Sequence, residues 1–66
     1  MDKYTRMQLE RIKTRNEHQA MMLKGAAGRE LKRKGGNIVS VEMGWAADMC
    51  SATANTIAYL LEREPQ

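Results

Sequence analysis

The sequence predicts an all-α fold, a small domain of three to four short helices, from three observations. Residues 3–34 are rich in unbranched helix formers and contain no β-branched run, so their side chains lose little rotamer freedom in a helix. Residues 35–37, Gly-Gly-Asn, then mark a helix stop and a turn. After this boundary, residues 42–50 and 53–64 have the composition of two further short helices. With 66 residues, the chain is expected to form one domain over 1–66.

The first segment, residues 3–34, allows two interpretations. Residues 15–19 are all polar and interrupt its apolar stripe. Either the segment is one long helix whose middle is solvated on every side, or Asn16 caps a second helix. We favour two helices, with Gln19 completing a capping box. Gly25 and Gly28 weaken helix here by about 1 kcal/mol each, and their spacing would let another helix approach closely. The stripe has steps near three and four: Leu9, Ile12, Ala20, Leu23, Ala27 and Leu31.

The second half is predicted to contain an extended lead-in and two helices. Residues 38–41 are a short β-branched stretch that suits extended backbone. Ser40 is then expected to cap a helix over residues 42–50, and residues 51–52 are expected to form a turn. Thr53 is predicted to cap a last helix that continues through Glu64, before a proline.

The placement of small and apolar residues between positions 43 and 61 resembles a helix-turn-helix DNA-binding domain of the winged-helix type, without the wing. Ala47 stands where two helices cross closely, Ser51 stands at the turn, and Ile57 and Leu60 follow at inward positions. The resemblance implies that the second helix enters a DNA major groove. Its contact residues would be Thr53, Asn55, Thr56 and Tyr59, with Asn55 able to pair with adenine.

The charges indicate where such a protein would contact phosphate. Residues 1–36 hold ten basic and four acidic residues, a net charge of +6, whereas residues 37–66 have a net charge of −3. This asymmetry indicates a polyanion partner, or pairing of one half with the other in a dimer. Because the last helix contains only one basic residue, phosphate contacts are expected from the basic run before the glycines, at Arg29, Lys32, Arg33 and Lys34.

Several classes of protein are excluded or not expected. A single cysteine, Cys50, excludes an internal disulfide framework and a cysteine-based zinc cluster. No nucleophile–base pair, carboxylate pair or phosphate-binding glycine loop is present, so we expect no enzyme activity, no cofactor and no metal. The polar N-terminus lacks a signal-peptide core and no apolar run approaches a membrane span, so a cytoplasmic protein with no membrane contact is expected.

These observations predict a small DNA-binding transcriptional regulator or accessory factor of phage or plasmid type, whose partner is double-stranded DNA. A homodimer is expected, with residues 3–24 as the dimer element, because one short module buries little surface. The alternative is a helical adaptor or inhibitor that modulates a larger host or regulatory protein, docking through Met21, Met22 and Lys24. A basic helical hairpin dimer that binds structured RNA is a third possibility.

Overall fold

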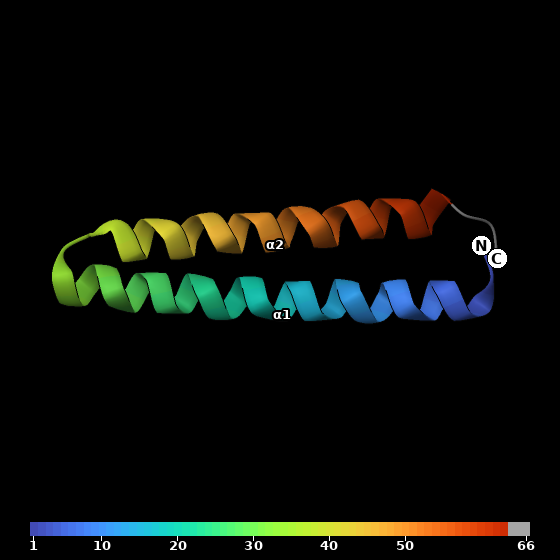
Figure 1. The fold of residues 1–66 in the computed structure, drawn as a ribbon, viewed down its shortest axis with the longest axis horizontal. Helices are drawn as coiled ribbons and strands as arrows, with labels where there is room; N and C mark the ends of the chain where they lie inside the picture. The colour runs from blue at the N-terminus through green and yellow to red at the C-terminus, as the bar shows by residue number, and fades with distance from the viewer. Residues whose placement is uncertain (64–66) are drawn as a thin grey trace.

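Two long helices form the whole described fold. The computed structural model describes residues 1–63, apart from the side chain of Lys34. Helix α1 (Lys3–Lys34) and helix α2 (Ile38–Arg63) lie side by side and antiparallel as a hairpin, with the start of α1 and the end of α2 at the same end (Figure 1). The hairpin measures 48 × 14 × 12 Å. The all-α prediction is confirmed, but the three to four short helices and the helix-turn-helix are not.

Helix α1 runs for 32 residues without a break, so the favoured division into two helices is wrong. Asp2 caps its N-terminus by accepting a 2.7 Å hydrogen bond from the backbone N–H of Thr5, and this bond lowers the pKa of Asp2. Asn16 is not a cap: its amide donates to the carbonyl oxygen of Ile12, one turn earlier in the same helix. The polar residues 15–19 are acceptable inside a helix because none of them forces the backbone out of it.

The predicted boundary at residues 35–37 is confirmed. Gly35 closes α1 in the left-handed conformation, with φ 70°, and its N–H donates to the carbonyl of Leu31 at 2.8 Å. Gly36 also has a positive φ, 87°. Two consecutive left-handed residues reverse the chain within three residues, and glycine adopts this conformation without a Cβ clash.

Asn37 caps α2, so the extended lead-in predicted for residues 38–41 is wrong. The Asn37 side chain accepts a 3.0 Å hydrogen bond from the N–H of Ser40, and the Ser40 hydroxyl accepts a 3.1 Å bond from the N–H of Asn37. This reciprocal arrangement is a capping box with serine in the usual glutamate position. Because the cap precedes them directly, the β-branched residues form the first turn of the helix at a small propensity cost.

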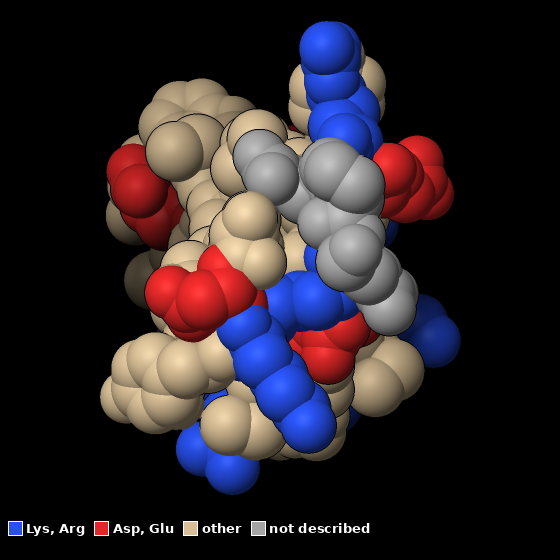
Figure 2. Space-filling model, turned by 90° about the vertical axis from the view of Figure 1, so that its right-hand side faces the viewer, with Lys and Arg blue, Asp and Glu red and all other residues tan. Residues whose placement is uncertain are grey.

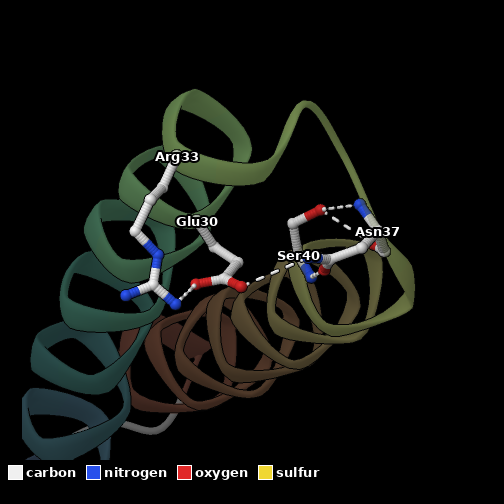
Figure 3. A network of polar contacts seen from close by, with 4 residues as sticks. All are labelled: Glu30, Arg33, Asn37 and Ser40. Carbon is white, nitrogen blue, oxygen red and sulfur yellow. Dashed lines mark hydrogen bonds and ion pairs between the residues drawn. The ribbon is translucent and has the colours of Figure 1, made fainter.

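The Asn37 cap also joins the loop to α1. Its side-chain amide donates to Glu30 at 3.2 Å, and the other carboxylate oxygen of Glu30 lies 3.6 Å from the Arg33 guanidinium (Figure 3). Ser40, which lies between the helices and is buried, makes a third bond by donating its hydroxyl to the Asn37 carbonyl. The turn is therefore fixed by a network that includes both helices.

Helix α2 continues through residues 51–52, so the turn predicted there is wrong. Thr53 does not cap a new helix, because its hydroxyl donates at 3.0 Å to the carbonyl of Met49, in the preceding turn of α2. Thr56 bonds in the same way to Ala52. A residue that bonds to the carbonyl four positions earlier accommodates its polar group inside a continuous helix. The predicted last helix ends within the described residues at Arg63, and Glu64 lies outside them.

The helices contact each other along stripes spaced alternately by three and four residues, as in an antiparallel coiled coil. The buried apolar residues of these stripes are small at most positions, which allows a close approach of the backbones; they are Ala20, Ala47, Ala54, Ile57 and Leu61. Gly25 and Gly28 do not contribute to this contact, contrary to expectation, since both are exposed. Among the described residues no large side chain is fully buried.

Candidate nucleic-acid interface

The side of α1 that points away from α2 carries cations and no carboxylate. We call it the outer face of α1 and define it by the nine positions 4, 8, 11, 15, 18, 22, 25, 29 and 32, which follow the spacing of the buried stripe but lie opposite to it. Its charged residues are Arg11, Arg15, Arg29 and Lys32, and all four are exposed. His18 lies between the two pairs. The three acidic residues of α1 lie elsewhere on the helix.

None of the four cations of the outer face has an acidic partner among the described residues, and Lys24, outside this face, also has none. Closer to α2, two cations are paired: Arg6 with Glu10 at 3.7 Å and Lys13 with Glu17 at 3.1 Å. The outer face therefore projects an uncompensated positive potential into solvent, whereas Arg6 and Lys13 are each compensated by a glutamate.

The spacing of these cations suits an extended polyanion. From Arg11 to Lys32 the helix rises 1.5 Å per residue, so the charges extend over about 31 Å. One turn of B-DNA occupies roughly 34 Å along its axis. An array of this length would reach phosphates over nearly one turn of a duplex.

The basic residues predicted from sequence have different positions in the structure. Arg29 and Lys32 belong to the outer face of α1, near the hairpin turn. Arg33 lies outside that face and pairs with Glu30. Lys34 ends α1, and its side chain lies outside the described part of the structure.

The predicted base-contacting residues lie on α2 and do not adjoin the basic group. Thr56 and Tyr59 are on the side of α2 directed away from α1, and the hydroxyls of Thr53 and Thr56 bond to their own helix. Tyr59 accepts a hydrogen bond from Arg63, whose guanidinium also lies 5.3 Å from the ring centroid. The exposed Asn55 lines a shallow groove on one flank of the hairpin. The outer-face cations thus point in the opposite direction from Thr56 and Tyr59, and one DNA duplex would not meet both groups.

Sequence reasoning missed Arg11 and Arg15, which the fold places on the same face as Arg29 and Lys32. The signal was present: from residue 4 to residue 32, steps of four and three meet four Lys or Arg side chains and no Asp or Glu. The prediction of two helices hid it, since a break near residue 15 would have destroyed the common face.

Concave surface is found along the contact between the two helices. Two shallow grooves follow the seam between the helices, the first including Arg6, Glu10 and Glu62 and the second including Glu17 and Asn55. Nowhere in residues 1–63 do three His, Cys, Asp or Glu side chains gather as they would around a metal ion. At the end that holds the termini, acidic and basic side chains are intermixed (Figure 2).

Helix α2 has a second exposed surface of different chemistry, which we call the outer face of α2. Every one of its side chains is exposed, and two are charged, Glu42 near one end and Arg63 at the other; two further exposed carboxylates, Asp48 and Glu62, lie along one edge of this face. Its large members include Trp45, 60% exposed, and Met49, 69% exposed. The full set is Ile38, Val39, Glu42, Trp45, Ala46, Met49, Ala52, Thr53, Thr56, Tyr59, Leu60 and Arg63.

Despite this apolar surface, neither helix in the described part of the chain combines the length and the apolarity needed to cross a lipid bilayer.

Comparison of the chain with protein-family models, with curated proteins and with solved structures finds no match.

Proposed function

We propose that this chain is a small accessory DNA-binding protein that contacts the phosphates of duplex DNA through the outer face of α1. The observation that carries the proposal is the row of four exposed, unpaired cations over about 31 Å without one carboxylate. Neutralising phosphates with lysine and arginine releases condensed counterions, which drives binding irrespective of base sequence.

The proposed mode is phosphate contact and not base readout. Thr53 and Thr56, which would face bases in a helix-turn-helix, have their hydroxyls bonded to α2 itself. Base contacts specify a sequence, whereas phosphate contacts only position the protein. We therefore expect weak sequence preference and a role as an accessory factor in preference to an operator-specific repressor.

Salt-dependent fluorescence anisotropy with a labelled duplex of random sequence tests this proposal. If all four cations contact phosphate, the logarithm of the association constant should fall with the logarithm of salt concentration with a slope near −3.6, about 0.9 for each contact. Replacing Arg11, Arg15, Arg29 or Lys32 singly by glutamine should reduce the magnitude of the slope by about 0.9.

Lys24→Gln is the matched control, because Lys24 is an exposed, unpaired cation of α1 that lies outside the outer face. Its slope should equal that of the original chain. If Lys24→Gln and Arg15→Gln lowered the magnitude of the slope equally, the slope would depend only on net charge, and the assignment of the binding face would be contradicted. A duplex RNA of the same length provides the second arm, and tighter binding to RNA would contradict the choice of DNA.

A second candidate function, a helical adaptor for a larger protein, is favoured by Met21 and Met22. Both are predominantly exposed, at 64% and 58%, although methionine is apolar and adapts its shape to irregular partners. In this case Met21→Ser and Met22→Ser should abolish pull-down of the partner. Met21→Ser should also leave DNA affinity unchanged, because Met21 lies outside the outer face of α1.

A further inference from the structure

We propose that the outer face of α2 binds the same face of a second copy of this chain, in antiparallel orientation, to form a four-helix assembly. The inference stands on the surface of α2 and is independent of the proposed contact between α1 and DNA. Four observations support it: the apolar character of α2, the excess surface of the hairpin, the size pattern along the face, and the position of its two charges.

Helix α2 has the composition of a helix covered on more than one side. Its contact with α1 buries only one stripe, and that stripe is built mainly of alanine and other small residues. Three of the larger side chains, Ile38, Trp45 and Tyr59, remain 55–68% exposed on the outer face. A helix that is apolar around most of its circumference is normally buried against several neighbours.

The hairpin exposes more surface than a chain of its length should. Its accessible surface is 5109 Å², whereas a compact monomer of this size exposes about 4,200 Å². The excess of about 900 Å² is close to the share that one partner buries in a standard protein–protein interface, near 800 Å². The radius of gyration, 15.0 Å, likewise exceeds the value of about 11 Å for a compact domain of this length.

The sizes of the side chains fit a two-fold axis that crosses α2 between Met49 and Ala52. In an antiparallel pair about this axis, Met49 lies opposite Ala52 and Trp45 lies opposite Thr56, so the two large side chains nearest the axis each meet a smaller one. Facing positions that alternate in size interdigitate well. A parallel pair would instead set Trp45 against Trp45 and leave Ala52 against Ala52.

The two charges also favour the antiparallel pair. The same axis places Glu42 beside Tyr59 and Arg63 of the second copy, so the single carboxylate of the face meets its single guanidinium twice per dimer. A parallel pair would place Glu42 against Glu42. The outer face of α1 is unsuitable for such self-association because two copies would bring arginines together. Residues 3–24 are therefore not the dimer element in this proposal.

Sedimentation equilibrium over a range of concentrations, combined with emission from Trp45, the only tryptophan, tests the proposal. We expect a dimer whose dissociation is accompanied by a red shift of the emission. Met49→Asp, at the centre of the face, should leave a monomer at every concentration. Lys24→Glu, an exposed change of charge outside the face, should leave the dimer intact.

A charge swap tests the orientation and does not depend on a destructive variant. Glu42→Lys and Arg63→Glu should each raise the dimer dissociation constant about tenfold, and the double variant should return it to the original value. Helical content by circular dichroism should be equal in the original chain, the two single variants and the double variant, at concentrations where each forms the dimer.

Three results would overturn the proposal. The first is a chain that stays monomeric at all concentrations with unchanged tryptophan emission. The second is a dimer that survives Met49→Asp, which would place the contact elsewhere. The third is a double variant no better than the single ones, which would exclude the antiparallel pairing.

Discussion

Asn37 has the largest structural role of any single polar residue in the hairpin, because one side chain performs two tasks. Its oxygen caps α2 by accepting from the N–H of Ser40, and its amide group donates to Glu30 of α1. The first bond satisfies a backbone donor that the helix cannot satisfy itself, and the second fixes the angle at which the chain leaves the turn.

Asn37→Ala should lower the free energy of unfolding by about 1 kcal/mol, the usual cost of losing an N-cap. Asn37→Ser separates the two tasks, since serine keeps the cap but cannot reach Glu30. Urea denaturation followed by circular dichroism at one fixed protein concentration checks both. If Asn37→Ser is as unstable as Asn37→Ala, the bond to Glu30 and not the cap is the stabilising contact.

Individual residues were also where sequence patterns misled most. Ser40, Thr53 and Asn16 are all good capping residues, and a cap was predicted at each position. In the structure, Asn16 and Thr53 bond to carbonyls one turn earlier, and Ser40 occupies the third position of a helix capped by Asn37. The same hydroxyl or amide can bond forwards as a cap or backwards inside a helix, so residue type alone does not decide.

At the scale of the elements, the glycines separate into those that end a helix and those that a helix merely tolerates. Gly35 has φ 70° and closes α1, whereas Gly28 is an ordinary helical residue with open space where a Cβ would stand. The continuity of α1 across Gly25 and Gly28 follows from the strong helix formers around them, which outweigh two small penalties.

Gly28→Ala should raise the free energy of unfolding by about 1 kcal/mol, because alanine restricts the unfolded chain and nothing obstructs its methyl group. Gly35→Ala should lower it by at least about 1 kcal/mol, because an L-residue is strained in the left-handed region. Thermal melts of both variants at equal concentration check the opposite signs. A destabilised Gly28→Ala would show that α1 has a contact at this position.

For the whole molecule, the decisive property is that the two helices present unlike surfaces to solvent. The outer face of α1 carries four cations and no anion, and the outer face of α2 carries one charge of each sign among apolar side chains. The two proposals assign polyanion binding to the first surface and self-association to the second. Both proposals use this division, and each can fail without the other.

The proposed dimer also makes a prediction about overall shape. Because the two-fold axis crosses the middle of α2, the second hairpin lies alongside the first and does not extend it. Small-angle X-ray scattering should then show a doubled mass with a maximum dimension close to that of one hairpin, 48 Å along its longest axis. A maximum dimension near twice that length would indicate end-to-end contact and contradict the arrangement.

The sequence by itself determined the helical class and the position of the turn. Unbranched side chains favour helix through local propensity. The two consecutive glycines before Asn37 end a helix for a reason that is equally local, their ease in left-handed backbone. It also determined the charge asymmetry between residues 1–36 and 37–66, since net charge depends only on composition. Arg29 and Lys32 could therefore be identified as candidates, although their neighbours on the same face could not.

Only the tertiary structure decided how many helices there are and which residues share a face. At residues 15–19 and 51–52, helical and non-helical backbone differ in free energy by only a few tenths of a kcal/mol per residue. The packing of the two helices, with Ala47 and Ala54 buried between them, outweighs this difference and keeps both helices continuous. Once both helices are continuous, Arg11 joins Lys32 on one face, and Trp45 joins Tyr59 on the other. A common face is a property of an unbroken helix, and local propensity does not contain it.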